Sequence, residues 1–167
     1  MNGKSRRPLR LSALLAALIS VAAPVCAQSA ALPTNFIGTP LNWVSVGTAR
    51  DQEHGEMQVY YSKYVALSPR DMMVAIALVY SSPRVSATSE TYWGEYVMDR
   101  IDCDAYSDLV PNLVNLFDEQ GRVLPEYKVD PKGNPIYATG SPPPKSQHWE
   151  RIPLGSPVEA VFRVICQ

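Results

Sequence analysis

The sequence lacks the short motifs that carry most enzyme chemistry. No GxSxG segment frames a serine, no HExxH or Cys-x-x-Cys pair is present, and no glycine-rich loop offers a phosphate cradle. Only two histidines occur, His54 and His148. We therefore expect a protein that is not an enzyme and uses no cofactor or metal. One alternative is a periplasmic hydrolase or metal-dependent enzyme that uses His54 or His148, which would need a nucleophile or further metal ligands placed near the histidine. Another is a purely structural protein of the envelope.

The sequence also lacks an excess of charge of either sign. It holds 15 Lys and Arg against 16 Asp and Glu, for a net charge of −1. Nucleic-acid binding through charge needs a basic surface, so we expect no nucleic-acid partner. The 167 residues fit one domain, and an apolar fraction of 46% is enough for a core.

Long apolar runs are absent except near the N-terminus. Leu11–Ala23 is apolar but shorter than the roughly 20 residues that a membrane helix needs. Four basic residues precede it and Val25-Cys26-Ala27 follows, which is the order of a secretory signal. We predict a signal peptide at residues 1–27. General secretion and twin-arginine export both remain open, because Arg6-Arg7 stands near the start.

Export changes what the totals mean. Removing the four basic residues of the signal shifts the net charge from −1 to −5 and leaves two cysteines, Cys103 and Cys166. An even pair in an exported chain predicts one disulfide. It would close a loop of about 64 residues and stabilise the fold by roughly 4 kcal/mol. Two buried free thiols are the alternative.

The mature chain is predicted to be rich in strands. Residues 28–40 form a polar lead-in that we expect to be flexible, and residues 41–167 form the folded domain. Met72–Tyr80 is apolar on both faces, which indicates a central strand. One face carries mostly small residues, such as Ala75 and Ala77, and we expect a helix to pack there. Further strands are expected at Trp43–Thr48, Val59–Tyr64 and Thr91–Cys103.

The second half of the chain mixes turns with one clear helix. Tyr106–Phe117 could be strand or helix, and Asp118–Gly121 indicates a turn with a strand pairing back across it. Val129–Gln147 is proline-rich and is predicted to be a surface loop with a tight turn at Lys132-Gly133-Asn134. Ser156-Pro157-Val158-Glu159 is a capping box, and an apolar stripe follows it to Ile165.

Two sets of residues are candidates for a surface role. Acidic residues surround Cys103, but the glycine of a calcium loop is missing, so we expect a solvated edge. Tyrosines gather on the predicted strands, where they could form a protein-binding surface or pack in a half-buried sheet. The acidic residues are Asp99, Asp102, Asp104 and Asp108, and the tyrosines are Tyr60, Tyr61, Tyr64, Tyr92 and Tyr96.

Several short segments stand in a characteristic order between about residues 42 and 166. They are Trp43-Val44-Ser45-Val46-Gly47, Val59-Tyr60-Tyr61, Leu78-Val79-Tyr80, Cys103, Gly121-Arg122-Val123, Trp149-Glu150-Arg151-Ile152-Pro153, Gly155-Ser156 and Cys166. This ordered set resembles the surface-adhesin protein E-like family of Gram-negative bacteria.

This resemblance implies an α+β fold with an antiparallel sheet of about six strands. A C-terminal helix would pack on the sheet, joined to it by the disulfide between Cys103 and Cys166. It also implies a binding protein without catalysis, able to form a homodimer, whose partner is a host extracellular-matrix or envelope protein. Because Val25 precedes Cys26 where a lipoprotein signal has a small residue, we expect residence in the periplasm. A lipoprotein at the outer membrane or cell surface is the alternative.

Overall fold

The computed structural model describes residues 30–36, 39–51, 55–109, 114–144 and 146–167. The predicted signal peptide and residues 28 and 29 lie outside these ranges. Within them, no helix has the length and apolar character needed to cross a membrane.

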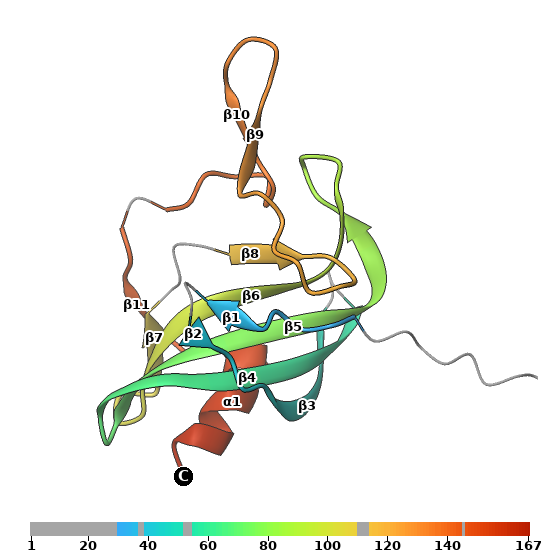
Figure 1. Ribbon diagram of the computed structural model, residues 1–167. Helices are drawn as coiled ribbons and strands as arrows, with labels where there is room; N and C mark the ends of the chain where they lie inside the picture. The colour runs from blue at the N-terminus through green and yellow to red at the C-terminus, as the bar shows by residue number, and fades with distance from the viewer. Residues whose placement is uncertain (1–29, 37–38, 52–54, 110–113, 145) are drawn as a thin grey trace, which may run out of the picture.

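In the described ranges, one antiparallel sheet of seven strands forms the body of the protein, with one helix packed on it (Figure 1). Six strands follow the order β11-β7-β6-β5-β4-β3, and β8 also pairs with β6. The sheet thus has the antiparallel class and terminal helix that we expected, with seven strands rather than about six. The elements are β3 (Val44–Asp51), β4 (Gly55–Ser68), β5 (Asp71–Val85), β6 (Thr91–Asp102), β7 (Ser107–Leu109), β8 (Val114–Phe117), β11 (Trp149–Arg151) and α1 (Pro157–Ile165).

Two small hairpins complete the fold. One pairs β1 (Asn35–Phe36) with β2 (Thr39–Pro40), and the other pairs β9 (Tyr127–Val129) with β10 (Pro135–Tyr137). The second hairpin projects from the body (Figure 1). Its turn at Gly133 was predicted, but its strands were not, since the proline-rich composition had indicated a loop.

The central strand β5 confirms one prediction and corrects another. It lies between β4 and β6, as its apolar residues predicted. The helix, however, packs on the face of large residues, with Val74, Ile76 and Tyr80. The expected packing of the helix against the small residues is therefore wrong. A helix of nine residues is short, and large sheet side chains are needed to fill the space between it and the sheet.

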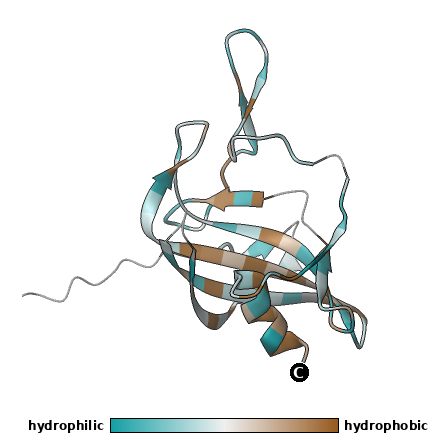
Figure 2. Cartoon of the chain, turned by 180° about the vertical axis from the view of Figure 1, so that it is seen from behind, coloured by the Kyte–Doolittle hydropathy of each residue, from teal (hydrophilic) through white to brown (hydrophobic). Residues whose placement is uncertain are grey.

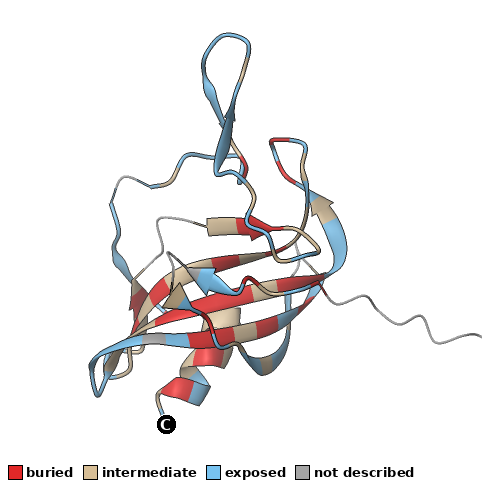
Figure 3. Ribbon diagram, viewed as in Figure 1, coloured by how far each residue is buried: buried red, intermediate tan, exposed pale blue. Residues whose placement is uncertain are grey.

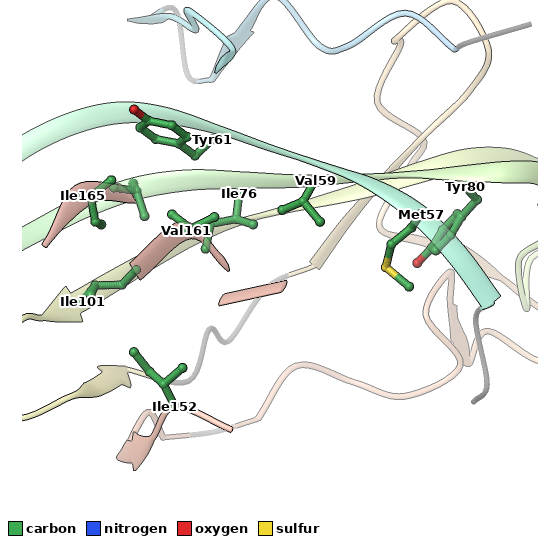
Figure 4. Packing of buried hydrophobic residues seen from close by; sticks show 10 residues of the cluster. Met57, Val59, Tyr61, Ile76, Tyr80, Ile101, Ile152, Val161 and Ile165 are labelled. Atoms are coloured by element: carbon green, nitrogen blue, oxygen red, sulfur yellow. The ribbon is translucent and has the colours of Figure 1, made fainter. Parts of the chain in front are cut away.

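The main core lies between this face and α1. Val161 is fully buried and Ile165 nearly so, and both lie among sheet residues such as Ile76 and Ile101 (Figure 4). Hydrophobic residues form a band along the central strands (Figure 2), and buried residues follow the same band (Figure 3). Burying such side chains contributes about 1.5 to 3 kcal/mol each.

The N-terminal segment covers the opposite face of the sheet. Ala30 packs against Ala77 and Val79, and Trp43 Nε1 donates a hydrogen bond of 2.6 Å to the Pro33 carbonyl. Ala30 and Leu32 of the lead-in therefore pack on this face, and the flexibility that we expected for residues 28–40 stays a prediction. The small residues of β5 leave room for a chain without regular structure, which explains their size.

Gly94 on β6 marks the closest approach on this face. A Cβ atom at this position would lie 2.3 Å from Phe117 Cζ and 2.4 Å from the Leu78 carbonyl oxygen. Real Cβ atoms do not come so near to backbone, so the strand must remain without a side chain here.

We predict that Gly94→Ala lowers the free energy of unfolding by about 2 to 3 kcal/mol, since overpacking a rigid site forces backbone movement. Urea denaturation measures it. The matched variant Phe117→Leu and the double variant form a cycle, and relief of the Cζ contact should make the two losses less than additive. A Gly94→Ala protein as stable as the parent would contradict the close approach.

The C-terminal helix begins and ends as its sequence predicts. Ser156 Oγ accepts a hydrogen bond of 3.1 Å from the Glu159 backbone N–H, and Pro157 occupies the first turn. Cys166 follows the helix and is bonded to Cys103, which follows β6. The disulfide is therefore confirmed, and it joins the end of the helix to the end of the long strand. Of Tyr106–Phe117, Ser107–Leu109 and Val114–Phe117 are strands, and residues 110–113 lie outside the description.

Candidate functional site

The tyrosines proposed as one surface lie on both faces of the sheet. Tyr61 is buried in the core under α1, and Tyr92 packs against that core. Tyr96 is buried on the opposite face, with Tyr60 against its cluster. The half-buried alternative thus describes these residues, because neighbouring positions on a strand point to opposite faces. The side chain of Tyr64 lies outside the described part of the structure.

His148 is the one histidine in the described part of the structure, and it lies beside a single carboxylate. His148 Nε2 lies 2.6 Å from Glu150 Oε1, and both side chains are exposed. His148 lies outside the lining of the two surface cavities, one at the start of α1 and the other beside Trp93. His54 lies outside the described residues. Among the residues that the structure does describe, no three His, Cys, Asp or Glu side chains gather as a metal site would require.

The acidic residues around Cys103 do not form the solvated edge that we expected. Asp104 is exposed and Asp102 caps the following turn, with its Oδ1 accepting from the Asp104 backbone N–H at 2.9 Å. Asp99 and Asp108, in contrast, are buried, with exposed fractions of 1% and 7%. The edge is thus divided, since the alternation of β6 turns Asp99 toward the core beside Val97 and Ile101.

Asp99 is the most unusual polar residue of the described fold. Neither of its carboxylate oxygens has a hydrogen-bond partner. Burial, followed by the charge of Asp108, raises the pKa of Asp99 to about 7. Burial also raises the pKa of Asp108. A buried carboxylate without partners is costly, so most structures provide one with donors.

A cavity of about 190 Å³ lies where α1 begins above β5 and β6. Ile76, Leu78 and Val97 form its sheet wall, and Val158 faces them from the first turn of the helix. Asp99 lines the same cavity, as does Glu95. The cavity therefore combines an apolar wall with two carboxyl groups. It is smaller than the 300 to 1,000 Å³ of ordinary drug-sized ligand sites.

The helix that borders this cavity is held by a separate polar network. Tyr106 Oη donates to Glu159 Oε1 at 3.0 Å, and Arg163 Nη2 approaches the same oxygen at 2.7 Å. The Gly155 backbone N–H donates to the other carboxylate oxygen of Glu159. These donors, the Gly155 amide first, lower the pKa of Glu159 to about 2. Glu159 on α1 thus has hydrogen-bond donors for both carboxylate oxygens, whereas Asp99 on β6 has none.

A second, more open hollow of about 330 Å³ lies beside Trp93 and the turn at 118–122. The one basic side chain in its lining is already paired, since Arg122 Nε contacts Asp118 Oδ2 at 2.7 Å. Asp118 also accepts backbone N–H groups of the turn, as the predicted turn requires. Asp118 and Arg122 therefore stabilise the turn that borders this hollow, and their bonding capacity is used within the turn.

The β9–β10 hairpin, which projects from the body (Figure 1), carries several exposed apolar side chains. Val129 pairs with Pro135 and Tyr127 with Tyr137, so these four side chains share one face of the hairpin. Tyr127 and Val129 are 50% and 61% exposed. The rings of Tyr127 and Tyr137 lie 5.9 Å apart. We call this set the hairpin face.

The base of the hairpin is fixed to the body. The Ala87 N–H donates to the Ala138 carbonyl at 3.0 Å, and Ala138 is buried. Lys128 Nζ, on the opposite face of the hairpin, donates to the Thr88 carbonyl at 3.1 Å. Asp130 closes the turn by accepting the Lys132 and Asn134 backbone N–H groups, both at 2.8 Å. A two-stranded hairpin is marginal alone in water, so these contacts hold the exposed face in place.

No known protein family, no curated protein and no solved structure matches this chain.

Proposed function

We propose that this chain is an exported, non-catalytic binding protein of the bacterial envelope, which binds a protein partner through the hairpin face. The observation that carries the proposal is the exposed pair Tyr127 and Val129 on an anchored, projecting hairpin. The motif order that resembles the surface-adhesin protein E-like family supports the same class of function. Its partner is a host extracellular-matrix protein or another envelope protein.

The chemistry of the hairpin face suits protein recognition. Tyrosine is enriched at protein interfaces because its ring offers a large contact area and its hydroxyl can form a hydrogen bond. Val129 and Pro135 are exposed and contribute nothing to the two core clusters. Fixing the hairpin in advance lowers the conformational entropy lost on binding.

We expect the double variant Tyr127→Ser and Val129→Ser to bind its partner at least tenfold more weakly, since loss of a central aromatic contact costs about 2 kcal/mol or more. Purified matrix proteins and solubilised envelope proteins are immobilised as a panel, and binding is measured by interferometry. The protein's stability should change little, because surface substitutions lie within about 0.5 kcal/mol.

The control variant carries Leu67→Ser and Val164→Ser, which are exposed apolar residues at the end of β4 and on α1. It should bind like the parent. Sedimentation of the parent and both variants shows whether the partner is a second copy. Absence of binding by the parent to every member of the panel, with no self-association, would defeat the proposal, as would equal losses in both variants.

A further inference from the structure

The cavity under the start of α1 has a chemistry that the proposed protein-binding role does not use. Its apolar wall is lined by Ile76, Leu78 and Val97, and Asp99 reaches it from the same face of the sheet. Asp99 is 1% exposed and lacks any hydrogen-bond partner. A side chain in this state has capacity for donors that the surrounding protein leaves unfilled.

We propose that this cavity binds a small organic cation, an ammonium group on a short aliphatic body. The ammonium group lies against the Asp99 carboxylate, and the aliphatic body lies between Leu78 and Val158. This site is independent of the hairpin face, which lies on a separate element.

Charge selects the class of ligand. Asp99 and Glu95 both line the cavity, and no basic side chain does. An anion would meet like charge at the Asp99 carboxylate, whereas an ammonium group supplies three donors and one positive charge. The helix terminus offers little to an anion, because Pro157 has no N–H and the Glu159 N–H is bonded to Ser156 Oγ.

Volume sets the size of the ligand. An apolar cavity of about 150 Å³ can hold a molecule of benzene size. The 190 Å³ available here therefore fits an aliphatic amine with about four to six carbons. A longer or branched ligand would extend from the cavity into solvent, because the Glu159 network and the disulfide hold α1 in place above it.

The pH dependence has a fixed direction. Asp99 must be ionised to bind the ammonium group, so affinity should rise with pH through the range in which Asp99 titrates. The other charged groups around it are Glu95 on β6 and Asp108 on β7, and the helix contributes only uncharged Pro157 and Val158. Both neighbours are carboxyl groups, which gain negative charge as the pH rises, so they also favour tighter cation binding at higher pH.

The test uses three probes with the same aliphatic body, n-butylammonium, n-butanol and butyrate. Calorimetry at pH 8 should give an affinity for butylammonium at least tenfold above that for butanol, with no binding of butyrate. At pH 5.5 the affinity for butylammonium should fall at least fivefold. Equal binding of butylammonium and butanol would overturn the proposal, as would binding of butyrate.

Variants locate the site. Asp99→Asn should reduce the affinity for butylammonium at least tenfold. Asp104→Asn should leave it unchanged, because Asp104 is exposed and lies in the turn after β6. Val158→Phe fills the cavity from the helix and should abolish binding without altering Asp99. Unchanged binding in both Asp99→Asn and Val158→Phe would refute the assignment.

An ammonium group on a four-carbon chain is also the end of a lysine side chain. A further probe, N-acetyl-lysine methylamide, separates these sources. Tighter binding than butylammonium assigns the site to a lysine of a polypeptide, and equal or weaker binding assigns it to a free amine. Either result supports the cation site, whereas failure of the parent protein to bind butylammonium would refute it.

Discussion

Replacing Cys103 and Cys166 with serine should lower the free energy of unfolding by about 4 kcal/mol. The bond closes a loop with a sequence separation of 63 residues, and an open chain gains that loop's conformational freedom when it unfolds. The effect is large because α1 has nine residues, too few to be helical alone in water. Helical content by circular dichroism should therefore decline with the stability.

Reductant supplies the matched control for this prediction. Dithiothreitol should shift the urea midpoint of the parent protein to that of the double serine variant, and should leave the variant unaffected. A loss below about 1 kcal/mol would mean that Val161 and Ile165 hold the helix by packing alone.

Asp99 should make the protein less stable as the pH rises from about 4 to 7. The pKa of this carboxyl group is about 7 in the folded protein, against an ordinary value of about 4 when unfolded. Between these values the unfolded chain has lost the proton that the folded chain keeps, so each pH unit favours unfolding. The full shift corresponds to roughly 4 kcal/mol, and above pH 7 the effect is constant.

The variant Asp99→Asn isolates this effect. Its free energy of unfolding, subtracted from that of the parent at each pH, should show the slope between pH 4 and 7, and Asp104→Asn should show none. Glu159 has the opposite dependence, since its lowered pKa gives stability that is lost as the pH falls from 4.5 toward 2. That contribution is shared by all three proteins. A parent and Asp99→Asn with parallel profiles would contradict the buried, unpartnered state.

Local patterns were sufficient for the long elements of the fold. The apolar run of β5 predicted a central strand, and the Ser156 capping box predicted the start of α1. Both depend on short-range chemistry, strand burial in one case and an N–H partner in the other. The face on which the helix packs depends on which segment covers the other face, and Ala30 and Trp43 are far from β5 in sequence. Pattern alone could not supply this contact.

The candidate sites were harder to predict for a related reason. Asp99 shares the alternation of Val97 and Ile101, and this mixture of acidic and apolar residues prevented the pattern from showing which face of the strand is buried. The significance of Asp99 depends on the absence of a partner, which only the assembled sheet and helix reveal. The hairpin was missed because prolines in residues 129–147 suggested a loop, whereas Pro135 stands at the first position of β10, where its missing N–H costs little.

The two faces of the sheet are covered by segments made before and after its long strands, and this affects how the protein must be made. Residues near Ala30 can cover their face once β4 to β6 exist, but the other face waits for Val161 and Ile165 of α1, which follow all the strands of the sheet in sequence. Until α1 has been made, an apolar sheet face remains open to water and to other chains. The contact order is accordingly high, which predicts slow folding and a period of exposure to aggregation. A chain truncated after Pro153 should therefore accumulate in aggregates, however intact its strands.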